Sequence, residues 1–154
     1  MQKREISLIL LVIFLITIGI TIANVFLEDT SNSHQKGTIK ISNTTVNYDA
    51  SGKCVEVIDG NTIQVYGVGR VQLSQVKTPN QGEIGFDEAK KFTEKECLSK
   101  TAYLDIDDKT PKDQYGRTLA IVYTNSADIN KELIKRGLGE ISYFPPSEFN
   151  KGEI

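Results

Sequence analysis

The stretch VIDGNTIQVYGVGRVQLSQVKTPN, residues 57–80, contains the pattern that decides the fold. Apolar and polar side chains alternate on both sides of Asp59-Gly60, a pair that is typical of a tight turn between two strands. A third run, residues 70–76, has apolar side chains at Val71 and Leu73. The three runs predict three short strands at the start of a small, mainly β domain.

Both helical and extended patterns follow these strands. We expect helices over residues 84–100 and 126–139 and strands over residues 101–107 and 117–124. Gly137 is placed to end the second helix, and Pro145 and Pro146 stop regular structure in the tail, where Ser147 could cap one more helical turn. This order predicts an α+β, mainly β fold: a five-stranded Greek-key barrel of the oligonucleotide/oligosaccharide-binding (OB) type with two or three packed helices.

The N-terminal part differs from the rest in composition. Residues 6–27 contain no charge and are long enough to cross a bilayer. We expect an uncleaved transmembrane signal-anchor helix that contacts the lipid bilayer, with a cleavable signal peptide as the alternative. Lys3 and Arg4 precede the span, which predicts a cytoplasmic stretch at residues 1–5 and an extracytoplasmic remainder. Residues 28–51 are predicted as a polar linker with a possible short strand, and residues 52–154 as the folded domain.

The composition excludes several kinds of catalytic site. His34 is the only histidine, and Cys54 and Cys97 are the only cysteines. The chain therefore has no Ser-His-Asp or Cys-His arrangement, and two distant cysteines are too few for a structural zinc site. From Ser51 onward, 14 Lys and Arg face 16 Asp and Glu. Because nucleic-acid binders usually have a basic face, this charge does not favour a nucleic-acid partner.

Four segments together resemble the staphylococcal nuclease (thermonuclease) family. VIDGNT is similar to the VIDGDT turn of that family, and VQLSQVKTPN to its third strand, usually RLxxVDTPE. DQYGRTLAIVY resembles its DxYGRxLAxV segment, and INKELIKRGLGEISY its second helix and the strand that follows. The resemblance extends from about Lys53 to Tyr143. It implies a barrel with packed helices and a calcium-dependent phosphodiesterase site on one barrel face.

Four positions depart from the residues that this resemblance assigns to catalysis. In the family pattern, two Asp hold calcium, a Glu serves as base or orients the water, and two Arg bind the phosphate. The corresponding residues here are neutral, apart from one lysine: Asn61 and Lys77 for the two Asp, Asn80 for the Glu, and Gln72 for the third-strand Arg.

Lys77 is the sharpest of these departures. At about 4 Å and an effective dielectric constant near 20, one positive charge repels another unit charge by about 4 kcal/mol. The resemblance therefore predicts that calcium binding by the family's mode is lost and that the chain uses no cofactor.

A few residues retain or could rebuild part of a site. Arg117 keeps the second phosphate-binding arginine, and Asp59 and Thr78 keep a turn carboxylate and a backbone-carbonyl ligand. Three more residues are candidates for binding: Arg70, Glu83 and Tyr115. Arg70 and Glu83 could instead be ordinary surface charge, and Tyr115 could close the barrel end instead of stacking on a base. Lys77 could bind an anion or pair with Asp59.

Cys54 and Cys97 both face the interior between the first strand and the first helix, according to the resemblance. A disulfide between them would close a loop of 42 residues, and two unpaired buried thiols are the alternative.

These observations predict a membrane-anchored, catalytically inactive binding module. Its ligand could be a protein, a glycan or an anion. The alternatives are an active extracellular nuclease with a rebuilt site and a purely structural module.

Overall fold

The computed structural model describes Phe14 and residues 36–152. The predicted cytoplasmic stretch 1–5, the rest of the predicted span 6–27 and residues 28–35 of the predicted linker lie outside the described residues. In the described part of the chain, no helix has the length and apolar character that a membrane crossing requires. The membrane span and its orientation therefore stay predictions.

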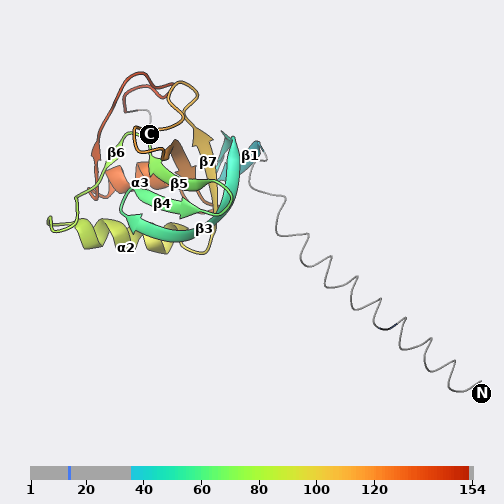
Figure 1. Ribbon diagram of the computed structural model, residues 1–154, viewed down its shortest axis with the longest axis horizontal. Coiled ribbons are helices and arrows are strands. Elements are labelled where there is room, and N and C mark those ends of the chain that lie inside the picture. Colours follow the sequence, from blue (N-terminus) through green and yellow to red (C-terminus); the bar gives the residue numbers. More distant parts are fainter. Residues whose placement is uncertain (1–13, 15–35, 153–154) are drawn as a thin grey trace, which may run out of the picture. The chain divides into compact units, whose positions relative to one another are not determined.

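Five strands close into a barrel in the order β3-β4-β5-β8-β7 (Figure 1). Their bounds are Ala50–Asp59, Thr62–Val65, Gly69–Leu73, Thr118–Tyr123 and Thr101–Ile106 in that order. Strands β5 and β8 are parallel, and the other neighbours in the barrel are antiparallel. Strand β3 is the longest and pairs with both β4 and β7, which closes the ring. The predicted five-stranded barrel is confirmed.

The barrel interior is filled by the alternating apolar side chains of these strands. Val57, Ile63, Val71, Leu104 and Val122 are all buried, each from a different strand. Successive strand residues point to opposite faces, so the alternation that the sequence shows places one face of each strand in the core. Burial of these aliphatic side chains is the main term that stabilises the domain.

Two helices pack against the barrel. Helix α2 (Phe86–Cys97) runs alongside β3 and buries Ala89, Thr93 and Cys97 (Figure 1). Helix α3 (Ile129–Lys135) begins after Asp128, whose carboxylate accepts a hydrogen bond from the backbone N–H of Lys131.

Helix α3 is also tied to the barrel by a buried amide. Asn130 is fully buried, and its side-chain oxygen accepts from the Val122 N–H at 2.9 Å. Its amide nitrogen donates to the Ser74 carbonyl at 2.8 Å. One side chain therefore satisfies two buried backbone groups that no strand partner reaches, and it fixes the chain just beyond β5.

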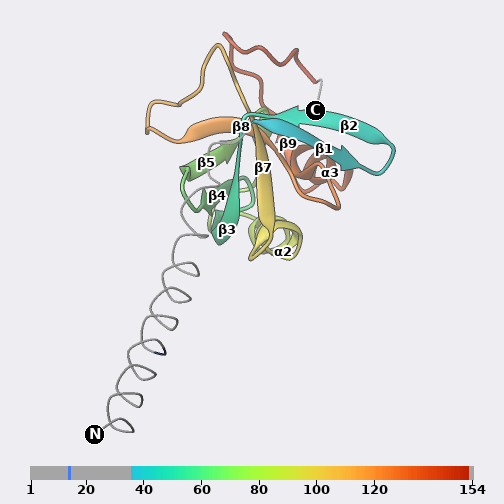
Figure 2. The same ribbon diagram turned by 90° about the vertical axis from the view of Figure 1, so that its right-hand side faces the viewer.

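Residues 37–48, within the stretch predicted as a linker, form a β-hairpin. Strands β1 (Gly37–Ile41) and β2 (Thr44–Tyr48) pair only with each other. Ile41 and Val46 pack with Tyr103 and Phe149 against the outside of β7 and β8. Figure 2 shows the hairpin on the same side of the barrel as α3. This hairpin adds a small second apolar cluster outside the barrel.

The described tail contains no third helix, and the helical turn expected after Ser147 does not form. The Ser147 hydroxyl instead donates to the Asp107 carboxylate, which also accepts from the Glu148, Lys109 and Thr110 N–H groups. The Gln75 amide donates to the carbonyls of Phe149 and Asn150 and accepts from the N–H of Gly152. Side-chain hydrogen bonds to the barrel thus replace helical ones and hold the tail as an extended strap.

Candidate functional site

The turn between β3 and β4 is supported from two sides. The Asp59 carboxylate accepts from the Asn61 N–H at 2.9 Å, and the Thr93 hydroxyl of α2 donates to the Gly60 carbonyl at 2.7 Å. A Cβ on Gly60 would lie only 2.7 Å from Ala89 Cβ and 2.8 Å from Thr78 Oγ1. Only glycine fits between the helix and the Thr78 side chain.

Asn61 connects this turn to the next segment of chain. Its amide nitrogen donates to the Val76 carbonyl at 2.6 Å, in the two-residue strand β6 (Val76–Lys77). The Thr62 hydroxyl lies 3.5 Å from the Asn61 side-chain oxygen. The side chain is half-buried and presents an amide donor to the backbone, so it acts here as a fixed structural connection.

Lys77 pairs with a residue other than the predicted one. Its ammonium lies 3.3 Å from the carboxylate of Glu140, its cross-strand neighbour in β9 (Glu140–Ile141), and no ion pair with Asp59 forms among the described residues. Cross-strand pairing brings these two side chains together. Both are exposed, so the pair contributes little to stability.

The segment after Lys77 consists of Thr78, Pro79 and Asn80. Thr78 is buried, whereas Asn80 is exposed and donates to the Glu83 carboxylate from its N–H at 2.7 Å and its amide at 3.2 Å. These hydrogen bonds hold the pKa of Glu83 below its usual value. Lys77, Thr78, Glu83 and Glu140 all line one shallow pocket of about 330 Å³.

Arg117 directly precedes β8 and is oriented by Asp113. Its Nε donates to the Asp113 carboxylate at 2.6 Å, and the N–H groups of Arg117 and Tyr115 donate to the same carboxylate at 2.9 Å. Burial alone would raise the pKa of Asp113, but these hydrogen bonds outweigh burial and hold it below its usual value. The guanidinium also lies 5.3 Å from the Tyr115 ring centre, within cation–π range.

A polar chain joins Arg117 to the strands of the barrel. Arg117 Nη1 lies 3.5 Å from the Thr62 hydroxyl, and that hydroxyl lies 3.2 Å from the Gln72 side-chain oxygen. Thr62 and Gln72 are opposite each other in the β4–β5 register, which explains their contact. The structure therefore brings Gln72, Tyr115 and Arg117 together on one face.

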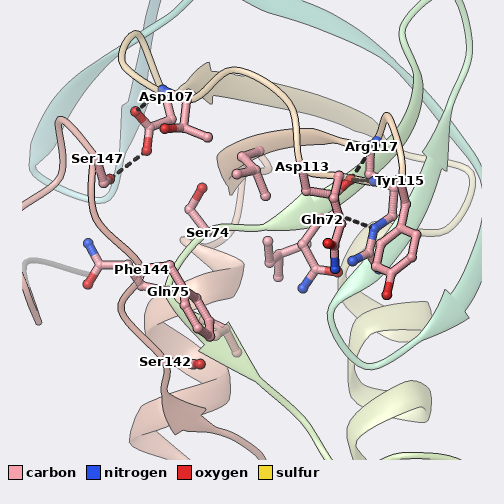
Figure 3. Close-up of a pocket in the computed structure, with 15 residues that line it drawn as sticks. Gln72, Ser74, Gln75, Asp107, Asp113, Tyr115, Arg117, Ser142, Phe144 and Ser147 are labelled. Atoms are coloured by element: carbon pink, nitrogen blue, oxygen red, sulfur yellow. Dashed lines mark hydrogen bonds and ion pairs between the residues drawn. The ribbon is translucent and has the colours of Figure 1, made fainter.

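A pocket of about 410 Å³ opens beside Arg117 (Figure 3). Gln72, Asp113, Tyr115 and Arg117 gather at one end in the figure, and Asp107 and Ser147 at the other. Ser74 lies between the two groups, and Phe144 of the tail forms another part of the wall. The strand β5, the loop before β8 and the strap at residues 142–147 together make this pocket.

Comparison with known proteins gives the family. Residues 70–153 match the sequence profile of the staphylococcal nuclease homologues. A thermonuclease of Staphylococcus intermedius is 35% identical over 121 residues, which cover 73% of this chain and 71% of that protein. The chain belongs to the staphylococcal nuclease family. Endonuclease YncB of Bacillus subtilis is also similar, at 29% identity over 71% of this chain and 53% of that protein.

Within this nuclease-family domain the positions singled out from the sequence fall into two groups. Asp59 and Asn61 lie in the turn, and Thr78 lies in the segment that packs on it. Lys77 and Asn80 belong to the same segment as Thr78. Gln72, Tyr115 and Arg117 line the larger pocket. Arg70 is exposed at the start of β5 and lines neither of the two pockets, and Glu83 lines only the smaller one.

The pocket also contains residues that the sequence did not indicate. Ser74 and Gln75 follow β5, and Ser142 and Phe144 come from the tail. Serine and glutamine after a strand are common in loops, so no local pattern marks them as lining residues. They are recognisable only once the strap is placed across the barrel.

Cys54 and Cys97 are both buried, and both are free thiols in this structure. Cys54 lies on β3, and Cys97 is the last residue of α2. The backbone groups of Cys54 bond to Ser99 and Lys100, just beyond the helix, which brings the two residues together. The hydrogen bond with Cys54, and then burial, raise the pKa of the Cys97 thiol. Their pairing as a disulfide stays a prediction.

Proposed function

We propose that this nuclease-family domain is a binding module that does not hydrolyse phosphodiester bonds by a calcium-dependent route. The observation that carries the proposal is Lys77, held by Glu140 at a position where the family resemblance expects a calcium-binding carboxylate. A positive charge within about 4 Å of a cation costs about 4 kcal/mol per unit charge at an effective dielectric constant near 20.

The neighbouring side chains do not fit calcium either. Calcium takes six to eight oxygen ligands, mainly carboxylates and carbonyls. Asn61 directs its amide nitrogen to Val76 O, and one Asp59 oxygen already accepts from the Asn61 N–H. This donor set offers too little negative charge, so we derive no catalytic step through a metal ion.

The position that the family resemblance assigns to the general base also holds no base. Asn80 is neutral, and the nearby Glu83 carboxylate is engaged by two hydrogen bonds from Asn80 that lower its pKa. A carboxylate with a lowered pKa is a weaker base near neutral pH. These features support a domain that holds a ligand without activating water.

The binding face in this proposal is the pocket beside Arg117. Arg117 is the one phosphate-binding arginine that the family resemblance retains, and it is only partly exposed. Its position is fixed by Asp113, so it can contact a ligand at little cost in side-chain entropy. Tyr115 extends the same wall with an exposed ring.

We also propose that residues 6–27 anchor the domain in a membrane, with the domain on the extracytoplasmic side. The support is the uncharged run and the basic residues Lys3 and Arg4 before it. Protease treatment of intact cells that express the full chain would test this. Digestion of the domain without lysis is expected, and protection of the domain until lysis would contradict the proposed side.

The proposed lack of hydrolysis can be tested on the purified full chain. Cleavage of single-stranded DNA and of RNA would be measured with calcium and with chelator, beside an Arg117→Ala variant as the control. We expect no cleavage above that control in either condition. Calcium-dependent cleavage that disappears in Arg117→Ala would overturn the proposal.

A second candidate function is nuclease activity with a rebuilt site. The names of the relatives, thermonuclease and endonuclease, favour it, as does the ordered pair of Asp113 and Arg117. Such a site would have to recruit Arg70 or Glu83, so cleavage lost in Arg70→Ala or Glu83→Gln would identify it.

A further inference from the structure

The pocket beside Arg117 contains a buried hydroxyl without a partner. Ser74 Oγ is the only buried side-chain polar atom in the described part of the chain that makes no hydrogen bond, and the residue is 6% exposed. Buried polar groups are almost always paired, because an unpaired one is costly. Ser74 lines the pocket, so a small rotation of its side chain would let a bound ligand supply the missing partner (Figure 3).

The charged groups of this pocket are already matched by protein partners. Asp113 is paired with Arg117, and Asp107 accepts from the Ser147 hydroxyl and three backbone N–H groups. The lining contains no lysine and no second arginine. A phosphate would therefore enter beside two carboxylates with a single cation that is already engaged, which favours an uncharged ligand.

The remaining hydrogen-bonding capacity is neutral. Gln72 uses its side-chain oxygen with Thr62, which leaves its amide nitrogen as a donor. The Ser74 hydroxyl can both donate and accept, and the Ser142 hydroxyl lies in the same lining. Such a mixture matches a ligand rich in hydroxyl groups, since each hydroxyl also donates and accepts.

Two exposed aromatic rings add flat apolar surface to the wall. Tyr115 is 75% exposed and Phe144 is 78% exposed, and both residues line the pocket. Exposed apolar surface gathered around one pocket is a feature of ligand-binding grooves. The apolar C–H face of a pyranose ring can pack on such a ring while its hydroxyls reach polar side chains.

We propose that this pocket binds a neutral sugar unit of a glycan. The volume of about 410 Å³ lies in the usual range for small-ligand sites, and OB barrels serve as binding scaffolds for oligosaccharides as well as oligonucleotides. The inference rests on the proposed binding function and names its ligand class. It assigns Ser74 and Gln72 to hydroxyl recognition and Phe144 to stacking.

The test is a titration of the purified full chain, kept in a polyoxyethylene detergent that has no sugar head group. The probes are the methyl glycosides of glucose, galactose and N-acetylglucosamine and the disaccharides cellobiose, lactose and chitobiose. Thymidine and thymidine 5′-monophosphate serve as nucleic-acid probes. Saturation-transfer NMR would detect binding and give dissociation constants by titration.

We expect at least one sugar to bind more tightly than both thymidine probes. Ser74→Ala is expected to weaken that binding by about two- to tenfold, the loss of one hydrogen bond, without lowering the unfolding midpoint. Phe144→Ala should weaken it at least as much. Tyr66→Ala removes an equally large exposed ring that does not line this pocket, so it should leave sugar binding unchanged.

Three results would overturn the inference. One is the absence of binding by all six sugars. The second is tighter binding of either thymidine probe, which would assign the pocket to nucleic acid. The third is sugar binding that is unaffected by both Ser74→Ala and Phe144→Ala. If sugars fail to bind and no calcium-dependent cleavage occurs, only the sugar inference is lost, and the proposed function stands.

Discussion

Two regions of the barrel face differ in how they treat their polar side chains. The first, which we call the corner, consists of Asp59, Asn61, Lys77 and Asn80. The second is the pocket beside Arg117. In the corner, the protein's own groups bind each other: Asn61 with Val76, Lys77 with Glu140, and Asn80 with Glu83.

The pocket, in contrast, leaves capacity for a ligand. Ser74 Oγ has no partner and two aromatic rings are exposed. The difference supports the proposal that this domain keeps the backbone of the family's site and binds its ligand at an adjoining surface. The polar side chains of the corner bond to other protein groups, whereas the pocket contains one buried hydroxyl without a partner. The following predictions test this contrast, from the largest expected effect to the smallest.

Restoring the acidic corner should produce a calcium site. The double variant Asn61→Asp with Lys77→Asp removes one positive charge and adds two carboxylates. Because removal of a single like charge is worth about 4 kcal/mol, we expect calcium affinity to rise by about 10³-fold or more. Calorimetric titration with calcium would measure it. Lys91→Asp places the same charge change as Lys77→Asp on the exposed face of α2 and should have no such effect. Tight calcium binding by the unaltered chain would contradict the stated difference between the corner and the pocket.

Oxidation of Cys54 and Cys97 to a disulfide should stabilise the packing of α2, the helix that supports the corner. Treatment of the full chain with oxidised glutathione should join Cys54 to Cys97 and release two reduced glutathione molecules. A closed loop of this length raises the free energy of unfolding by about 3–4 kcal/mol in the chain-entropy model. Thiol labelling and denaturant unfolding would measure both effects. A matched Cys97→Ser chain should gain nothing, and an equal stability of oxidised and reduced chains would refute the prediction.

The position of Ser74 in the pocket wall should depend on the buried side-chain amide of Asn130. Asn130→Ala leaves the Val122 N–H and the Ser74 carbonyl without their partner, and an unsatisfied buried group costs about 1–3 kcal/mol. We expect a loss of about 3 kcal/mol in the free energy of unfolding, measured by chemical denaturation. The exposed Asn125→Ala should change it by less than about 0.5 kcal/mol. A similar small loss in both variants would show that α3 does not fix this wall.

The smallest effect concerns Asp105, near the strap that walls the pocket. Burial, and then the charges of Asp49, Glu148 and Asp108, raise the pKa of Asp105 to about 6. The native state therefore binds this proton more tightly than the unfolded state, so the free energy of unfolding falls as the pH rises from about 4 to about 6.

Asp105→Asn should remove this pH dependence. After allowance for solvent screening of a half-exposed group, we expect a gain of about 1 kcal/mol at pH 7 and none below about pH 4. Denaturant unfolding at several pH values would show it, with the exposed Glu56→Gln as the control. A gain that is equal at both pH values would contradict the assigned titration.

The sequence predicted the barrel well, because its pattern is local. Two patterns depend only on residues a few positions apart: the alternation around Asp59-Gly60 and the helical spacing of apolar residues in residues 84–100. The strands and α2 form where these patterns predict them. The corner positions were also identified, since they lie in two short segments that resemble the family. The partner of Lys77 was not, because Glu140 is distant in sequence and meets it only through the pairing of β6 with β9.

The contacts of the strap and of the hairpin could not be predicted from residues close in sequence. Residues 28–51 were predicted as a polar linker with a possible short strand, and a strand does form at Gly37–Ile41. The packing of Ile41 and Val46 was not predicted, because their apolar surface includes Phe149, more than a hundred residues later. Ser147 has the character of a helix cap, but Asp107 offers its hydroxyl a stronger, charged acceptor. Both outcomes depend on groups that only the folded barrel brings near.

The sequence by itself determined the barrel, its helices and the loss of the family's acidic side chains. The reason is that the spacing of apolar residues and the identity of each residue can be read directly from the sequence. Tertiary structure alone decided which polar groups are satisfied. Hydrogen bonds such as Asn61 to Val76 and Asn130 to Ser74 join residues 15 and 56 positions apart, and the hydroxyl of Ser74 is left over once they form. The pocket exists because three distant segments close around that hydroxyl.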